Sequence, residues 1–202
     1  MLRRKHDASF VDVPRQRNLR EENSDSKKDK NGTRSKLSQK DTDARWMTKS
    51  GKRHFGYKNH INADTTTKLI TKFSVSSAAP HDSTEIENLV DEDDNTLYVD
   101  SAYRSKEIET YLKSKNCKSQ VHEKGYRNHP LSEEQKESNN IKSKTRARVE
   151  HIFGFMTNSM NNALHMTSIG LQRIESSIGL LNLTCNLFRY EQLVRLQKVK
   201  TM

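Results

Sequence analysis

The stretch NTLYVDSAYRS, residues 95–105, decides the fold that the sequence predicts. Its apolar run, residues 97–99, leads directly into Asp100 in a chain that is only 31% hydrophobic. A short apolar run of this kind is typical of a buried strand. Because ligands of open α/β sheets bind beyond the carboxyl ends of the strands, Asp100 stands where a site is expected. The alternative is that Asp100 caps the helix that follows, and this stretch alone leaves both readings open.

The segments on either side of this strand predict alternating strands and helices. Hydrophobic patterns predict strands at 7–13, 96–99 and 117–124, a hairpin of 55–64 with 68–79, and helices at 81–90, 105–115, 145–160 and 174–196. Asp82 or Ser83 is the expected cap of the helix at 81–90. The polar residues 125–144 are expected to be irregular. The alternation late in the chain favours an α/β fold with a mixed sheet flanked by helices.

Charge is distributed unevenly over the 202 residues. The net charge is +10, and residues 1–60 hold 17 Lys and Arg against 8 Asp and Glu, whereas residues 61–100 hold 2 against 9. Residues 14–54 almost lack apolar side chains and are expected to form a long basic loop, ordered if at all by a partner. Basic flanks attract the phosphate backbone of nucleic acids, although they are equally typical of a solvated surface.

Other features restrict the class of protein. No apolar run approaches the roughly 20 residues of a membrane helix, and the N-terminus lacks the apolar core of a signal peptide. No membrane partner is therefore expected, and the predicted location is cytoplasmic and nucleoid-associated. Cys117 and Cys185 are isolated in the sequence, which favours reduced thiols.

Two further acids stand out by their contexts. Glu150 lies inside the amphipathic stripe of the 145–160 segment beside Val149, and Asp7 opens the first predicted strand. An ion pair with Arg146 explains Glu150 poorly, because Arg preceding Glu is the less favourable order on a helix. Two aspartates and a glutamate from separate elements can hold two divalent cations for phosphoryl transfer. Their hard oxygens suit Mg²⁺ or Mn²⁺.

Seven blocks of the sequence together resemble one family. They are DASFVDVPRQRN (7–18), QKDTDARWMTKSGKRHFGYKNHI (39–61), SAAPHDS (77–83), LYVDSAYRS (97–105), KGYRNHPLSEEQK (124–136), RARVEHIFGFM (146–156) and IGLLNLTCNLFRY (178–190). In this order they resemble the DDE transposases of bacterial insertion sequences, the insertion-sequence-five group. The resemblance covers the chain from about Asp7 to Leu196, and the motifs are specific in combination rather than singly.

This resemblance implies a ribonuclease-H-like catalytic domain that cleaves and transfers DNA strands at transposon ends with two Mg²⁺ or Mn²⁺ ions. By motif, the catalytic and metal-binding acids are Asp7, Asp100 and Glu150. Arg146, four residues before the glutamate, is implied as a phosphate contact. The full set of predicted DNA contacts is Arg146, Arg148, Lys58 and Arg104. The implied partners are transposon ends and target DNA, and a homo-oligomer on DNA is expected because two ends must be paired.

The sequence also departs from the family pattern. Ser143 and Thr157 stand where related groups place a tyrosine and a lysine, and the apolar half of the first strand is replaced by residues 3–6, RRKH. The strand of Asp7 is therefore not expected to be a central, buried one.

Family members carry a long region before the first aspartate, so the resemblance predicts an N-terminally truncated chain. Its expected parts are a remnant first strand at 1–13, a basic loop at 14–54 and a catalytic domain at 55–202 that ends in a helix. Two functions follow from this division. One is an active DDE transposase domain. The other is a catalytically impaired remnant that binds only DNA or a full-length partner.

Overall fold

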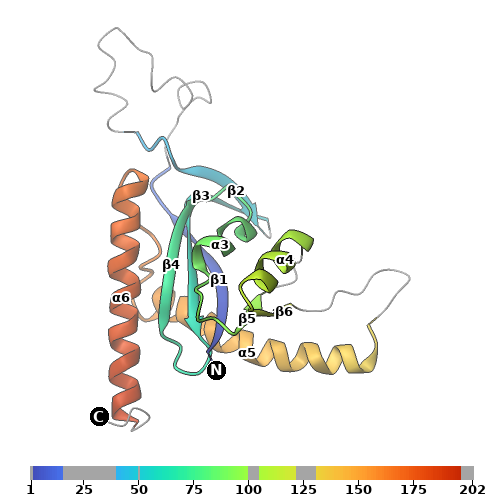
Figure 1. Cartoon of the computed structure of the whole chain (residues 1–202). Coiled ribbons are helices and arrows are strands. Elements are labelled where there is room, and N and C mark those ends of the chain that lie inside the picture. The colour runs from blue at the N-terminus through green and yellow to red at the C-terminus, as the bar shows by residue number, and fades with distance from the viewer. Residues whose placement is uncertain (1, 16–39, 50, 100–104, 122–130, 197–202) are drawn as a thin grey trace.

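The computed structural model describes residues 2–15, 40–49, 51–99, 105–121 and 131–196 (Figure 1). The strands are β1 (Arg3–Asp12), β2 (Arg45–Lys49), β3 (Lys52–Asp64), β4 (Ile70–Ser77), β5 (Thr96–Val99) and β6 (Lys118–Val121). The helices are η1 (Asp82–Glu85), α3 (Ile86–Leu89), α4 (Lys106–Ser114), α5 (Glu133–Asn158) and α6 (Leu171–Arg195). Among these described helices, none combines the length and apolarity that crossing a bilayer requires.

A six-stranded mixed sheet organises the molecule. Its strands follow the order β2-β3-β1-β5-β6, and β4 pairs with β3. β3 is antiparallel to β1, β2 and β4. β5 is parallel to both of its neighbours, β1 and β6. The predicted α/β class, with a mixed sheet flanked by helices, is therefore confirmed.

β1 lies at the centre of this sheet, between β3 and β5, although it begins with residues 3–6, RRKH. The expectation that this strand is not central was wrong. The guanidinium of Arg4 donates to Asp94 Oδ1 at 3.1 Å and to Asp64 Oδ2 at 3.4 Å. The buried ammonium of Lys5 forms an ion pair with Asp7. Opposite charges thus offset the cost of burying a basic strand.

The first residues of β3 lie in the segment 14–54 that was predicted to be a loop. The hairpin of β3 with β4 is present as expected, paired from Tyr57 with Ser77 to Ala63 with Ile70. However, β3 already begins at Lys52, and its first residues pair with β2. Residues 45–49 and 52–54, predicted to lie in the basic loop, therefore form strands. Their side chains are mostly exposed, so no apolar alternation marked them in the sequence.

Asp41 holds another part of that predicted loop inside the molecule. It is 1% exposed, and its Oδ1 accepts a hydrogen bond from the Tyr57 hydroxyl at 2.5 Å. Its Oδ2 accepts from the backbone N–H of Gly170 at 3.2 Å, and Asp43 Oδ2 accepts from that of Leu171 at 3.3 Å. These acids supply acceptors for the free N–H groups at the start of α6, which carries no side-chain cap of its own.

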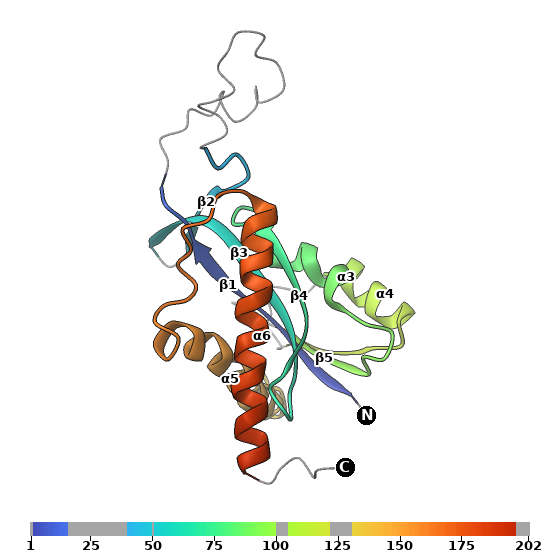
Figure 2. The same cartoon turned by 90° about the vertical axis from the view of Figure 1, so that its left-hand side faces the viewer.

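Helices cover both faces of the sheet (Figures 1 and 2). One core packs α5 and α6 on the central strands; its members include Val11, Tyr57, Ile61, Val149, Ile152, Met156, Ile174 and Ile178. A second core joins α3 and α4 to β5; its members are Ile86, Val90, Leu97, Val99, Leu112 and Cys117. Val11 belongs to the first core and lies four residues after Asp7 on β1. Asp7 therefore projects from the face that α5 and α6 cover.

The helix boundaries differ from the predictions at two places. α5 begins at Glu133, not 145, because Ser132 and Gln135 form a capping box that starts a helix inside the segment expected to be irregular. The segment at 81–90 is a short 3₁₀ turn followed by α3, and its cap is His81, whose side chain accepts from the Ser83 N–H. The other predicted elements, β5, β6, α4 and α6, lie within the expected ranges apart from their ends.

Candidate active site

Asp7 lies on the central strand with both carboxylate oxygens engaged. The ammonium of Lys5, two residues earlier on the same face, donates to Oδ2 at 3.0 Å, and the Ala8 N–H donates to Oδ1 at 3.0 Å. The side chain of Asp7 is 28% exposed, whereas that of Lys5 is only 2% exposed. A buried cation therefore stands directly behind a partly open carboxylate.

Asp100 lies outside the described residues, but the strand before it is defined. β5 ends at Val99 and pairs in parallel with β1, and Lys5 and Tyr98 are partners in this ladder. Asp7 follows Lys5 by two positions in the sequence, and Asp100 follows Tyr98 by two. The two predicted aspartates therefore stand at equivalent offsets from one pair of a parallel ladder.

Glu150 lies on α5 and is exposed. The residue before it, Val149, is fully buried in the core that also contains Val11 of β1. α5 thus packs on the sheet face from which Asp7 projects. The structure brings the helix of Glu150 and the strand of Asp7 together on one face.

The predicted DNA contacts have different positions. Arg146 and Arg148 belong to α5, one turn or less before Glu150, and their side chains lie outside the described part of the structure, as does all of Arg104. Lys58 is 4% exposed. In the antiparallel ladder of β3 with β1 it pairs with Phe10, so its side chain lies on the sheet face opposite Asp7. Its ammonium donates to the Pro80 carbonyl at 2.5 Å.

A salt bridge of 2.7 Å also joins the Lys58 ammonium to Asp82. Burial disfavours the charged carboxylate, but Lys58 outweighs it and holds the pKa of Asp82 below its usual value. The motifs GYKNH and HDS therefore meet in space and fasten the 81–90 segment to the sheet. This burial argues against the predicted DNA contact of Lys58.

Comparison with known proteins agrees with this arrangement of strands, helix and acids. A family model described as "Transposase DDE domain" matches residues 4–187. The chain belongs to the DDE transposase family. The match extends from the start of β1 to within α6, and it contains all three predicted acids of this transposase domain.

A curated relative supports the same family. Over 152 residues the chain is 31% identical to the "Transposase for insertion sequence element IS1106" of Neisseria meningitidis serogroup B, which covers 74% of the chain and 52% of the relative. The chain thus spans about half the length of this relative. No solved structure gives a significant match to the DDE transposase chain.

The donor chemistry of the predicted acids fits a hard divalent cation, since all are carboxylates. In the described part of this transposase domain, no three His, Cys, Asp or Glu side chains gather in a way that could hold a metal ion, and that part does not include Asp100. The ammonium of Lys5 occupies Oδ2, one of the two oxygens that Asp7 could offer to a cation. A metal ion at Asp7 would therefore have to displace or tolerate this ammonium.

Sequence reasoning missed two features of the transposase domain. It treated Lys5 only as a charge that disfavours a buried strand. The signal was its spacing, because residues i and i+2 of a strand share a face. It also missed the ribbon of β2 with the start of β3, which exposes the basic residues Arg45, Lys49, Lys52 and Arg53. The guanidinium of Arg53 lies 4.9 Å from the ring centre of Trp46, which is 41% exposed.

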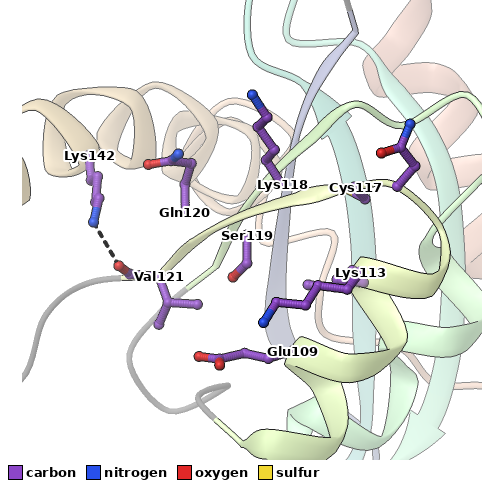
Figure 3. A pocket seen from close by; sticks show the side chains of 10 residues that line it. Glu109, Lys113, Cys117, Lys118, Ser119, Gln120, Val121 and Lys142 are labelled. Atoms are coloured by element: carbon purple, nitrogen blue, oxygen red, sulfur yellow. Dashed lines mark hydrogen bonds between the residues drawn. The ribbon is translucent and has the colours of Figure 1, made fainter.

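A cavity of about 510 Å³ lies between α4, β6 and α5 (Figure 3). Lys142 of α5 closes one side by donating to the Val121 carbonyl at 2.9 Å. Glu109 and Lys113 of α4 bring both charge signs to its wall. Of the candidate acids that the structure describes, neither Asp7 nor Glu150 lines this cavity.

Proposed function

We propose that the chain is the catalytic domain of a DDE transposase that cleaves DNA at insertion-sequence ends and transfers the strands. The observation that carries this proposal is the parallel ladder of β1 with β5. In the sequence, Asp7 and Asp100 each follow a partner of this ladder, Lys5 or Tyr98, by two positions, and the helix of Glu150 packs on the face of β1 from which Asp7 projects. Three acids from a central strand, its neighbour and a covering helix match the set that the family resemblance implies.

A ribonuclease-H-like fold is part of this proposal. Two features support it. The sheet is mixed, with a parallel half of β1, β5 and β6 and an antiparallel half of β4, β3 and β1, and helices cover both of its faces. The first aspartate lies on the central strand of this sheet, and the glutamate lies on a long helix against the same face. These positions support the proposed roles of Asp7 and Glu150 in such a fold.

Asp7, Asp100 and Glu150 would together hold two Mg²⁺ or Mn²⁺ ions, which when bound stabilise the attacking and leaving oxygens of phosphoryl transfer. Arg146 lies one helical turn before Glu150, where its charge would orient a DNA phosphate next to the acids. Arg148 and Arg104 are proposed as further phosphate contacts from α5 and from the segment after β5.

The exposed β2–β3 ribbon is proposed as a second DNA contact. A two-stranded ribbon fits the major groove of B-DNA, and Lys and Arg side chains on it would neutralise phosphates. Arg45, Lys49, Lys52 and Arg53 carry four positive charges on ten residues of two paired strands. Trp46 lies among them and is 41% exposed, with the guanidinium of Arg53 over its ring.

A second candidate function is favoured by the ion pair of Lys5 with Asp7. If the buried ammonium keeps a cation from Asp7, the domain would bind DNA or a full-length transposase without cutting. Both candidates share the family and differ in catalytic competence.

The test is nicking of a duplex that contains the terminal repeats flanking the gene, with Mg²⁺ or Mn²⁺. The catalytic proposal predicts nicks at the repeat ends, lost in Asp100→Ala and in Glu150→Gln. Nicking that persists in both variants would refute the assignment of the acids. Binding of the duplex without nicking by the wild type, together with nicking by Lys5→Met, would favour the non-catalytic alternative.

A further inference from the structure

The orientation of α6 on the sheet is fixed by specific contacts. Asn182 and Asn59 of β3 exchange side-chain hydrogen bonds of 2.9 and 3.3 Å, and both residues are buried. The amide of Asn186 bonds the backbone N–H and carbonyl of Ile70, each at 2.8 Å. These polar anchors, together with the buried Ile178, determine which face of α6 points away from the sheet.

The face that points away is apolar and exposed. It carries Leu180, Leu183, Leu187, Tyr190 and Val194, which are 67%, 54%, 60%, 52% and 38% exposed. We call these five residues the α6 stripe. The inward face of the same helix holds Ile174, Ile178, Leu181 and Cys185 in the core. Since a helix on a protein surface is normally polar on its outer side, an apolar outer side indicates an interaction surface.

The spacing of the α6 stripe points to a helical partner. Its members follow one another at steps of three, four, three and four residues, which is the a and d pattern of a coiled-coil seam. The charged residues of this segment, Arg189 and Glu191, lie outside the five stripe positions. The stripe is about 21 Å long at 1.5 Å per residue. Figure 2 shows α6 in front of the sheet, with no other element lying over it.

We propose that the α6 stripe is the seam of a homodimer, in which α6 packs on α6 of a second copy of this chain. A self-complementary apolar stripe satisfies the requirement of a two-fold interface that each copy offers the same patch. Five large side chains exposed to this degree amount to roughly 500 Å² per copy, so a dimer buries about 1,000 Å², the lower bound of a specific interface. The inference needs neither metal nor DNA and is independent of the proposed catalytic function.

The first experiment measures the mass of the purified chain by light scattering and sedimentation, from about 1 µM to about 100 µM. The expected mass is twice the 23.4 kDa of one chain. The double variant Leu183→Glu with Leu187→Glu is expected to be a folded monomer, with a dissociation constant weakened more than about hundredfold. Because both residues are exposed, circular dichroism should show unchanged helicity.

The matched control is Ile141→Glu, which places the same charge on an apolar residue of α5 that is 61% exposed. It should leave the dimer intact. A wild-type monomer at the highest concentration, or a dimer that persists in the double glutamate variant, would overturn the proposal. A monomer would point instead to another occupant of the α6 stripe, such as a segment of a longer transposase.

Disulfide trapping tests the seam directly. Leu187 is the middle residue of the α6 stripe, so in a parallel or an antiparallel pair it meets its own copy. Leu187→Cys should therefore form an intermolecular disulfide in mild oxidant, whereas Leu180→Cys should do so only in a parallel pair. The native Cys117 and Cys185 are buried, and burial raises the pKa of each thiol to about 11, which keeps their background low. Absence of the Leu187→Cys disulfide would contradict the seam.

Discussion

The ammonium of Lys5 donates to the carboxylate of Asp7 at 3.0 Å, from a side chain that is 2% exposed on the central strand. This pair places a fixed positive charge at the first acid of the candidate active site. The two residues share a face because they are two positions apart on β1. The pair also explains how a strand that begins with basic residues lies inside the sheet.

Lys5→Met is expected to strengthen the binding of Mn²⁺ to the chain, because a buried like charge next to the cation is removed. A tenfold decrease in the dissociation constant, equal to about 1.4 kcal/mol, is the expected size. Electron paramagnetic resonance of free Mn²⁺ measures it without any reaction. Lys58→Met removes a buried lysine on the opposite face and is the matched control. Equal affinity in the wild type and Lys5→Met would show that Lys5 does not compete with the metal ion.

The double variant Lys52→Gln with Arg53→Gln is expected to weaken binding of duplex DNA by this chain. Loss of two phosphate contacts should make the fall of the logarithm of the association constant with the logarithm of the salt concentration shallower, reducing the magnitude of the slope by about two. Fluorescence anisotropy across a salt series measures both quantities. The exposed Lys106 and Lys113 of α4, changed together to Gln, are the control and should leave the slope as it is. A slope unaltered by the ribbon variant would remove the ribbon from the DNA interface.

Tyr57→Phe is expected to lower the free energy of unfolding by about 1–3 kcal/mol, because the buried carboxylate of Asp41 loses its side-chain donor and keeps only backbone N–H donors. Tyr57 is fully buried, and burial followed by the bond to Asp41 raises the pKa of its hydroxyl. Urea denaturation measures the change. Tyr111→Phe, whose hydroxyl makes only a long 3.4 Å bond at the surface, should cost little. Equal stabilities of the two variants would contradict the role given to Asp41.

Stability is expected to fall in acid because two buried histidines stay neutral in the folded chain. Burial, followed by the nearby charge of His60, lowers the pKa of His6 from 6.5 to about 3, and burial lowers that of His60 to about 4. The unfolded chain therefore binds more protons between about pH 6.5 and these values. Each histidine then removes up to about 1.4 kcal/mol per pH unit as the pH falls through this window, and has no effect above it.

His6→Phe keeps an aromatic ring at this buried position and removes one of the two titrations. Urea denaturation at pH 7.5 and 5 should therefore show a smaller loss of stability for His6→Phe than for the wild type. His151→Gln changes an exposed histidine of α5 and serves as the control. Identical losses in the wild type and His6→Phe would mean that His6 does not titrate in this way.

Gly56→Ala is expected to destabilise the chain by more than about 3 kcal/mol. The backbone of Gly56 has φ +149°, and an added Cβ would lie 2.2 Å from the carbonyl oxygen of Val11. Thermal unfolding measures the loss. Gly154→Ala, in α5 with no atom within 4 Å of the added Cβ, should stabilise by about 0.5–1 kcal/mol. A Gly56→Ala chain as stable as the wild type would refute the close approach of β3 to β1.

Much of the fold followed from local patterns. Alternation marked the hairpin of β3 with β4, a continuous apolar run marked β5, and helical spacing marked α6; all three patterns depend only on neighbours in the chain. The family was identified from blocks that lie in order along the sequence, and the matching family model confirms it. The start of α5 was missed because its capping box, Ser132 with Gln135, was read as part of a polar loop.

What the sequence by itself determined is therefore the order of most elements, with the exception of β2, together with the family and the choice of the three candidate acids. Only the tertiary structure decided that β1 is central, that Lys5 stands on Asp7, and that Lys58 is held inside the protein by Asp82. The central position of β1 depends on its pairing with β5, in which the paired residues are 93 positions apart, as in Lys5 with Tyr98. A local pattern shows which face a charged side chain occupies, but the cost of burying it is set by the partner that the fold brings to it.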